Sequence, residues 1–327
     1  MRNKIYSLIA ATCGVLFVAC GSNGKQVPVA STEHIEVPAF DADSAYAYIE
    51  AQVAFGPRVP NTPQHVACGE FLATKLKELG AKVTSQYADL IAFDGTVLKA
   101  RNIIGSYSPE KKKRIALFAH WDTRKWADAD PDEKNWNTPI LGANDAASGV
   151  GVLLEIARAI RDNEPELGVD IIFFDAEDYG APRFYQGKHL DEYWCLGSQY
   201  WSRVPHVEGY NARFGILLDM VGGKDARFYK EYYSMRFARD ICQKVWAKAK
   251  DLGYADFFID EQKGAATDDH LFINEIARIK TIDVIPHSDE DAFFAFWHTV
   301  QDTMENIDRS TLKAVGETIL HVLYTEQ

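Results

Sequence analysis

The sequence predicts an α/β fold: a single domain in which a mostly parallel, twisted central sheet has helices on both faces. Apolar runs of strand length alternate along the chain with longer stretches whose apolar residues recur at helical spacing. Strands that are apolar throughout are typical of a sheet buried on both sides, and alternation with helices is typical of parallel order. From Phe40 onward the chain has no linker, low-complexity break or internal repeat, which favours one domain.

The composition is that of a globular, acidic protein. Of the 327 residues, 47% are hydrophobic and 12% aromatic, which is enough for a sizeable core. The formal net charge of −12 argues against a nucleic-acid groove or a polybasic membrane surface. We therefore expect no nucleic-acid partner and a membrane contact only through the N-terminus, and we expect a monomer.

The N-terminus has the pattern of a secretory signal that ends at a lipid-attachment site. Arg2 and Lys4 precede an apolar stretch that closes with "FVAC", which resembles the cleavage box of bacterial lipoproteins, with Cys20 as the lipidated residue. The predicted organisation is a signal peptide over 1–19, a lipid-anchored flexible tether over 20–36 and a folded domain over 37–327. This places the protein in a bacterial cell envelope, anchored in a membrane and facing the periplasm or the surface. The alternative is a plain cleaved signal in which Cys20 is incidental.

Two helices are predicted before the first strand of the sheet, and two more between the later strands. The first two are "ADSAYAYIEAQVAFG" and "HVACGEFLATKLKELG", the second of which stops at Gly80. The later two are "SGVGVLLEIARAIRDN" and "EYYSMRFARDICQKVWAKAKDLG". Four apolar runs are predicted as the buried strands: "RIALFAH", "VDIIFFDAED", "FGILLDMVG" and "IARIKTIDVI".

Histidine and acidic residues follow these strands or lie in the intervening loops. In parallel sheets the functional groups gather just past the carboxyl ends of the strands. The residues concerned are His120, Asp122, Asp145, Glu177, Asp178, Asp219, Asp268, Asp269, His270 and His298. Histidine with carboxylates, without suitable thiols, is the ligand set of zinc or a similar divalent ion. A cation would also offset the cost of placing several acids beside the aromatic residues of "FFDAEDYG".

Each of these residues has a simpler explanation when it is taken alone. Asp145 precedes a helix that begins near Ser148, so it could serve only as a helix cap. His298 could be a partly buried hydrogen-bonding residue. The four strand-end and loop positions, taken together with His298 near the C-terminus, favour a metal site over these separate explanations.

Two other features are interpreted as structural. Asp128, Asp130 and Asp132 mimic the start of a calcium loop, but the glycine and glutamate that such a loop requires are absent, so we expect a solvated acidic loop. After processing, Cys68, Cys195 and Cys242 remain; we expect buried thiols with at most one disulfide.

Taken in order, the motifs resemble those of a known family. "HWD", "GANDAASG", "FFDAED", "LLDMVG", "TDDHLFI" and "WHTVQDT" occur as they do in the zinc aminopeptidase superfamily. They are most similar to the glutaminyl cyclases of the animal type, and in particular to a bacterial lipoprotein branch. The resemblance runs from about "AQVAFGPRVPNTP" to the C-terminus. It implies a zinc-aminopeptidase-like fold for the zinc-dependent catalytic domain over 37–327.

The resemblance also implies roles for individual residues. It implies one zinc per chain, held by Asp145, Asp178 and His298, with Glu177 as the proton shuttle. Asp219 and Asp269 would form a supporting acid network, and Trp297 and Trp194 would contact the substrate, a peptide or protein with an N-terminal glutamine. His120 matches a ligand of the two-zinc aminopeptidases. It would therefore either bind a second metal or contact the ligands of the first metal without binding that metal. Two departures are that Asp178 stands where many relatives have glutamate, and that the segment around Trp194 differs from the animal enzymes.

Two alternatives remain open at this point. A zinc aminopeptidase with two metals would use His120, Asp145, Asp219 and His298 with Glu177 or Asp178, all of which are present. "DDH" and "WHT" favour the cyclase, because aminopeptidases commonly have Ser-Asp-His and Tyr-His-Thr there. A surface lipoprotein that binds peptide or metal without catalysis is the third hypothesis, and the intact Glu177 argues against it.

Overall fold

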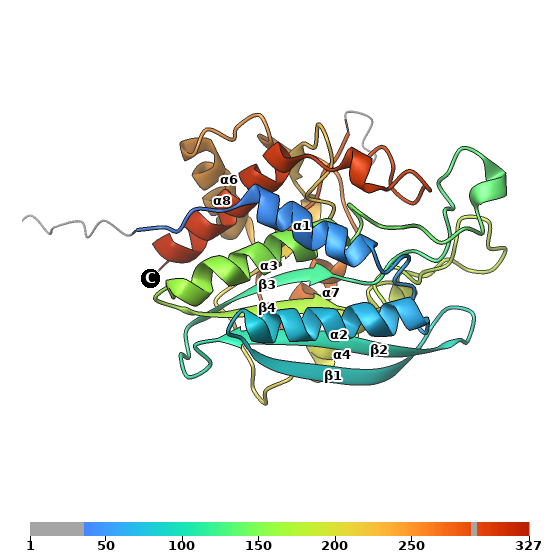
Figure 1. Cartoon of the computed structure of the whole chain (residues 1–327), viewed down its shortest axis with the longest axis horizontal. Helices are drawn as coiled ribbons and strands as arrows, with labels where there is room; N and C mark the ends of the chain where they lie inside the picture. The colour runs from blue at the N-terminus through green and yellow to red at the C-terminus, as the bar shows by residue number, and fades with distance from the viewer. Residues whose placement is uncertain (1–35, 289–292, 327) are drawn as a thin grey trace, which may run out of the picture. The chain divides into compact units, whose positions relative to one another are not determined.

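Six strands build the central sheet, and four of them form where the sequence is continuously apolar. The computed structural model describes residues 36–288 and 293–326, which belong to one compact unit. The strand order is β1-β2-β4-β3-β5-β8. Figure 1 labels the first four of these strands. The strands span β1 (Lys82–Ile91), β2 (Val97–Tyr107), β3 (Arg114–His120), β4 (Gly168–Phe174), β5 (Gly215–Leu218) and β8 (Thr281–Val284). A separate pair consists of β6 (Phe228–Lys230) and β7 (Phe258–Gln262).

The sheet is mixed, and its parallel part carries the predicted site. Strand β3 lies between β4 and β5 and is parallel to both, and β5 is parallel to β8. These are the four strands that the apolar runs predict: β3 spans the whole of its run, and the other three are shorter than their runs. Their parallel order brings their carboxyl ends to the same edge of the sheet, which confirms the predicted fold class.

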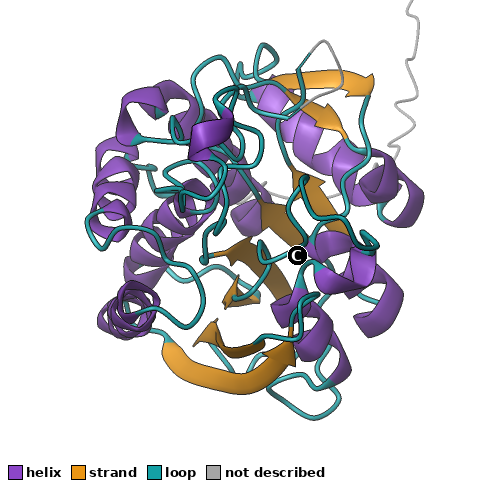
Figure 2. Ribbon diagram, turned by 90° about the vertical axis from the view of Figure 1, so that its right-hand side faces the viewer, coloured by secondary structure: helices purple, strands orange, loops and turns teal. Residues whose placement is uncertain are grey.

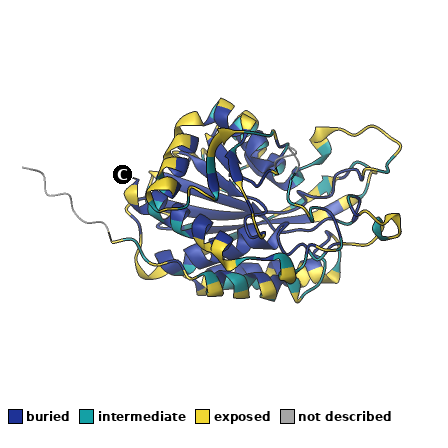
Figure 3. Cartoon of the chain, turned by 90° about the horizontal axis from the view of Figure 1, so that it is seen from above, coloured by how far each residue is buried: buried dark blue, intermediate teal, exposed yellow. Residues whose placement is uncertain are grey.

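Helices cover both faces of the sheet, as Figure 2 shows. The helices are α1 (Ala42–Val53), α2 (Pro63–Glu78), α3 (Ala147–Asp162), α4 (Leu196–Arg203), α5 (Tyr232–Phe237), α6 (Arg239–Asp251), α7 (Asp269–Phe272) and α8 (Arg309–Thr325). Side chains of β3 alternate between two cores: Leu117 packs in the core shared with α1, α2, α3 and α8, and Phe118 packs against Trp201 of α4. Buried strands between helices with exposed outer surfaces are visible in Figure 3.

Several elements differ from the sequence prediction, and α4, α7 and the pair β6–β7 are among those not predicted. Strands β1 and β2 were not predicted; they pair antiparallel at one edge, where β1 contains only exposed and half-buried residues and lacks a continuous apolar run. The helix predicted over 231–253 is two helices, because Ala238 leaves helical geometry at φ −140° and ψ 42°. Helix α8, also not predicted, packs on α1, α3 and α6.

The described residues also answer the questions about cysteines and membrane spans. Cys68, Cys195 and Cys242 are buried free thiols, so no disulfide joins them. No helix within 36–288 or 293–326 is both long enough and apolar enough to cross a membrane. The predicted signal peptide, the lipidation site Cys20 and nearly all of the tether lie outside the described residues.

Candidate active site

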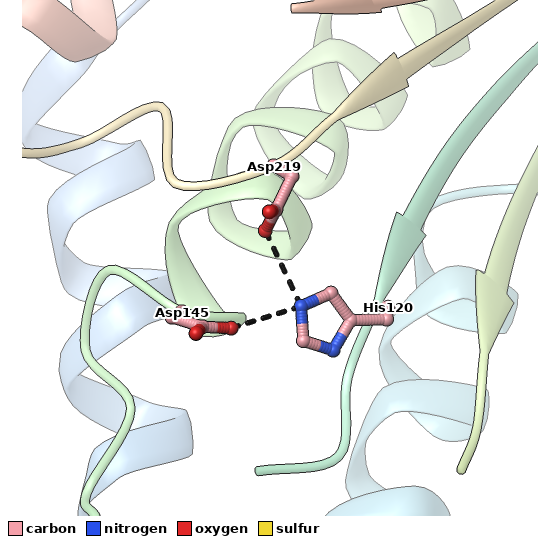
Figure 4. Close-up of side chains that lie close together, drawn as sticks. All are labelled: His120, Asp145 and Asp219. Carbon is pink, nitrogen blue, oxygen red and sulfur yellow. Dashed lines mark hydrogen bonds and ion pairs between the residues drawn. The ribbon is translucent and has the colours of Figure 1, made fainter. Parts of the chain in front are cut away.

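The carboxyl ends of the parallel strands hold a first group of possible metal ligands. His120 is the last residue of β3, Asp219 follows β5, and Asp145 lies in the loop before α3. Nε2 of His120 lies 3.0 Å from Oδ1 of Asp145 and 3.3 Å from Oδ1 of Asp219. Figure 4 shows the imidazole pointing at both carboxylates, which come from different elements. These three residues could hold a metal ion.

A second group consists of the three residues that the family resemblance implies as zinc ligands. Nε2 of His298 lies 3.1 Å from Oδ1 of Asp178 and 3.5 Å from Oδ2 of Asp145. All three side chains are buried and their ligand atoms lie within reach of a single ion. Neither carboxylate oxygen of Asp178 accepts a hydrogen bond from a described residue, although both are buried. A cation is the partner that such a carboxylate lacks.

Asp145 belongs to both groups, and helix capping does not explain it. Helix α3 begins at Ala147, and its N-cap residue, Ala146, makes no side-chain capping bond. The two carboxylate oxygens of Asp145 instead face the two histidines, His120 and His298. Its position is set by Asp302, which accepts hydrogen bonds from the backbone N–H groups of Asn144 and Asp145.

The three acids of "FFDAEDYG" are buried, so they are not a solvated loop. Asp175, Glu177 and Asp178 are 0%, 8% and 1% exposed. Asp175 has a structural role: both of its oxygens lie 2.9 Å from Nε2 of His65, and it accepts a hydrogen bond from the backbone N–H of Arg101.

Glu177 lies beside the two metal groups without being part of either. Its backbone N–H donates to Asp122, its Oε1 accepts a hydrogen bond from the Cys195 thiol, and its Oε2 lies 3.9 Å from Nδ1 of His120. Burial raises the pKa of Glu177 well above its ordinary value; His120 opposes this rise, and nearby carboxylates such as Asp178 add to it. The site therefore contains a carboxyl group that is suited to carry a proton.

A small pocket opens onto this cluster. Its volume is about 50 Å³, and the wall includes the predicted substrate residues Trp194 and Trp297 together with Phe293. The indole of Trp297 stacks on the imidazole of His298 at 3.8 Å between ring centroids, and Trp194 lies parallel to the same imidazole at 6.3 Å. Trp194 also approaches Gly180 so closely that a Cβ there would lie 2.1 Å from the indole, so only glycine fits.

Acidic residues form one wall of the pocket. Asp219 and Asp268 line the pocket, and Asp269, which follows Asp268 in the chain, is fully buried. Asp268 is the N-cap of α7 and its carboxylate lies near Glu177 and Cys195. Burial raises the pKa of Asp219 to about 7, against a hydrogen bond with His120 that lowers it.

The interpretation of Asp128 and Asp130 as a solvated acidic loop is wrong. Both residues are buried, and only Asp132 is exposed. Asp128 forms a double hydrogen bond with Arg124 and places Oδ1 3.5 Å from Nδ1 of His298. Metal-binding histidines usually donate their second ring N–H to such a carboxylate. Asp128, the first acid of the segment that mimics a calcium loop, thus lies at Nδ1 of His298, while Nε2 of the same ring faces Asp145 and Asp178.

Four residues of this site adopt positive φ angles although none is glycine. They are Ala176 at 54°, Cys195 at 55°, Met220 at 51° and His298 at 53°. Such conformations are uncommon for residues with a side chain and are found where the surrounding structure imposes them, often at functional sites. His298 is itself a predicted site residue, and the other three adjoin Glu177, Trp194 or Asp219 in the sequence; Cys195 also contacts Glu177.

The electrostatics of the site are those of a cation centre. Burial alone would lower the pKa of His298, but Asp178, Asp128 and Asp145 outweigh it and raise the pKa to about 10. The carboxylates outnumber the two histidines, so in a dry site the negative charge must be balanced by protons or by a cation. The donor set of imidazole and carboxylate oxygens is the one that zinc accepts.

Comparisons with known proteins agree with this geometry. The model of a family described as peptidase family M28 matches residues 102–323. A crystal structure of Bacteroides thetaiotaomicron glutaminyl cyclase bound to N-acetylhistamine is 69% identical, with a TM-score of 0.89, covering 89% of this chain and 100% of that one.

Two further relatives differ in how they are described. A second Bacteroides thetaiotaomicron structure, described as a leucine aminopeptidase precursor, is also 69% identical, with a TM-score of 0.88, covering 90% of this chain and 100% of that one. Among curated proteins, the glutaminyl-peptide cyclotransferase of Bos taurus is 24% identical in an alignment 302 residues long, which covers 82% of this chain and 78% of the relative. The chain therefore belongs to peptidase family M28 and, within it, to the glutaminyl cyclases.

Proposed function

We propose that this protein converts the N-terminal glutamine of peptides and proteins to pyroglutamate and releases ammonia. The observation that carries the proposal is the position of Glu177: a buried carboxyl group beside the Asp145–Asp178–His298 group, at a small pocket walled by Trp194 and Trp297. Cyclisation needs three parts together: a metal group that polarises the γ-carbonyl, a carboxyl group that carries the proton, and an enclosed pocket for one side chain.

Asp145, Asp178 and His298 fit one zinc ion per chain. The fit rests on the buried oxygens of Asp178, which accept no hydrogen bond from a described residue, and on Asp128, which lies near the second ring nitrogen of His298. A zinc bound there would act as a Lewis acid that polarises the γ-carbonyl group of the glutamine. His120 lies outside this ligand set and holds Asp145 and Asp219 in place through its Nε2.

Glu177 carries the proton through the reaction. It accepts a proton from the substrate's α-amine as the amine nitrogen forms a bond to the γ-amide carbon. It then gives this proton to the leaving nitrogen as the bond between that nitrogen and the carbon breaks, so that ammonia departs and the five-membered lactam remains. One carboxyl group can serve both steps if its pKa lies near the working pH, and the raised pKa of Glu177 is in that direction.

The pocket residues bind the substrate's first residue. Trp297, stacked on His298, and Trp194 provide apolar walls that exclude water and strengthen nearby electrostatic interactions. Asp219 and Asp268, on the acidic side of the pocket, are placed to accept hydrogen bonds from the substrate's α-amino group. A site of about 50 Å³ suits a single small side chain and leaves the remainder of the peptide outside.

Product analysis tests the proposal against the aminopeptidase alternative. Gln-initiated peptides should yield pyroglutamyl peptides and ammonia in equal amounts, while aminoacyl amides of leucine or alanine should be cleaved little. The aminopeptidase alternative depends on the first metal group, His120–Asp145–Asp219, because a second ion bound there would complete a two-metal site. Release of free N-terminal leucine without ammonia from Gln peptides would overturn the cyclase.

The location and the assembly of the protein belong to the same proposal. The signal-like N-terminus with Cys20 supports export to a bacterial cell envelope and a lipid anchor, with the catalytic domain facing the periplasm or the surface. A single complete set of pocket and metal residues within one chain is compatible with a monomer. Membrane contact is then limited to the anchor.

A further inference from the structure

The main chain at Glu177 is held from two sides. On one side its backbone N–H donates to Oδ1 of Asp122 at 3.1 Å. On the other side the backbone N–H groups of Cys195 and Leu196 donate to the carbonyl oxygens of Glu177 and Ala176, at 2.9 and 3.0 Å. The start of α4 is thereby attached to the turn that carries the proposed proton carrier.

The side chain of Glu177 receives only one hydrogen bond from the described residues. The Cys195 thiol donates to Oε1 with an Sγ–Oε1 distance of 3.1 Å. Oε2 lies 3.9 Å from Nδ1 of His120, which is too far for a hydrogen bond. The two carboxylate oxygens therefore differ: Oε1 is anchored, and Oε2 is free to exchange protons.

Cys195 is suited to this contact by its burial and its conformation. The residue is fully buried, and burial raises the pKa of its thiol well above the ordinary value, so the sulfur keeps its proton and donates it in the hydrogen bond. It occupies the N-cap position of α4, yet its side chain makes no capping bond. Its positive φ of 55° directs the thiol instead to the carboxylate of Glu177.

We propose that Cys195 is a positioning residue for catalysis, which fixes the rotamer of Glu177 by holding Oε1 and so presents Oε2 to the substrate. The inference rests on the proposed function, because it requires Glu177 to be the proton carrier. A glutamate side chain has three rotatable bonds, and holding it in one orientation before the reaction removes an entropic cost from the barrier. The contact should therefore contribute to kcat and contribute little to substrate or zinc binding.

Substitution of Cys195 tests this directly. In Cys195→Ala we expect kcat for a Gln-initiated peptide to fall about tenfold, which corresponds to about 1.4 kcal/mol, while KM and zinc content stay within about twofold of wild type. Cys195→Ser should recover most of kcat, because a hydroxyl donates a hydrogen bond from nearly the same position. If the alanine variant does not fold, Cys195→Gly gives the same comparison, since glycine suits the positive φ.

The other two buried thiols provide matched controls. Cys68 and Cys242 are also fully buried and free, and they lie outside the site, so Cys68→Ala and Cys242→Ala should keep kcat within about twofold per folded molecule. A double-mutant cycle adds a second test: in a Glu177→Gln background, Cys195→Ala should lower the residual rate no further.

Specific results would overturn the inference. Full kcat in Cys195→Ala, no recovery in Cys195→Ser, or the same tenfold loss in the Glu177→Gln background would each show that the thiol does not act through Glu177. A wild-type protein that cyclises no Gln peptide would instead overturn the proposed function. The two failures are distinguishable because the inference depends only on ratios between variants of an active enzyme.

Discussion

At the scale of single residues, the site separates one proton carrier from the metal-binding groups. Glu177 contacts Cys195 and lies 3.9 Å from His120, whereas Asp178, the next residue, faces His298 at 3.1 Å. Two adjacent acids thus point in different directions from the same turn. This arrangement allows the two proposed roles, catalysis and metal binding, to be tested independently.

The catalytic role is tested by Glu177→Gln. We expect kcat for Gln-peptide cyclisation to fall about 10²–10⁴-fold, because the amide cannot accept and return the proton. Zinc per chain should equal that of wild type, since the ligand side chains are unchanged. The measurements are ammonia release and metal content of the purified protein, and near-normal turnover would show that another group moves the proton.

The metal-binding role is tested by two histidine variants. His298→Ala should lower zinc per chain, because it leaves only the carboxylates of Asp145 and Asp178 as ligands. His120→Ala should keep zinc near one per chain if the ion occupies the proposed group. The exposed His189 provides a control, since His189→Ala should change neither zinc content nor activity. Equal zinc loss in the His120 and His298 variants would support a two-metal site.

At the scale of secondary structure elements, Glu231 connects α5 to the segment that leads into α7. Its carboxylate accepts hydrogen bonds from the backbone N–H groups of Tyr233, Ser234 and Ala266, and it contacts Nε2 of His270 at 3.0 Å. Burial would raise the pKa of Glu231, but the hydrogen bond and the attraction of His270, with the backbone donors, outweigh it and lower the pKa to about 2. The ionised carboxylate is therefore part of the folded state.

This contact predicts a specific dependence of stability on pH. The folded-state pKa of Glu231 is about 2, below its ordinary value of 4.5, so its contribution is present above pH 4.5 and is lost as pH falls towards 2. Glu231→Gln should lower the free energy of unfolding by about 3 kcal/mol at pH 7, and the difference from wild type should shrink between pH 4.5 and 2. Denaturant unfolding at fixed zinc concentration measures both quantities.

An exposed glutamate of the neighbouring strand gives the matched control for that experiment. Glu261, in β7, is solvent-exposed, so Glu261→Gln should stay within about 0.5 kcal/mol of wild type over the same pH range. A Glu231→Gln variant whose deficit stays constant down to pH 2 would show that the contact stabilises by packing and not by charge.

The elements also show which parts of the fold a sequence pattern can predict. The four parallel strands and the helices α1, α2 and α3 were predicted because continuous apolar runs and helical spacing are local signals. The break between α5 and α6 was not, because no glycine or proline marks it; buried Ala238 leaves helical geometry within the packed structure. Edge strand β1 was missed because exposure on one side removes the apolar run.

At the scale of the whole molecule, the proposed anchor stays a prediction, because Cys20 lies outside the described residues. Wild-type protein should fractionate with membranes and leave them only with detergent, since two or more lipid chains at about 0.8 kcal/mol per buried CH₂ hold stably. Cys20→Ser should lose this attachment. Protein made from residue 36 onward should remain folded and cyclise Gln peptides, because no apolar core pattern begins earlier. Wild-type protein in the soluble periplasmic fraction, with an unlipidated N-terminus, would contradict the anchor.

Several features of the site follow from the sequence alone. Parallel strands bring their carboxyl ends to one edge, so the position of His120, Glu177 and Asp219 near one another follows from the strand pattern. The chemistry follows as well, because imidazole and carboxylate side chains without thiols suggest zinc. The order of motifs then indicates the glutaminyl cyclase family.

Only the tertiary structure decided the contacts that hold those residues. Asp128 meets His298 across 170 positions of sequence, and the Cys195 thiol reaches Glu177, in the turn after β4, from the start of α4. Asp268, the extended N-cap residue of α7, lines the pocket, whereas Asp269, the first residue of the helix, is fully buried. Residue types and local periodicity are encoded locally, whereas side-chain partners distant in sequence depend on how the elements pack.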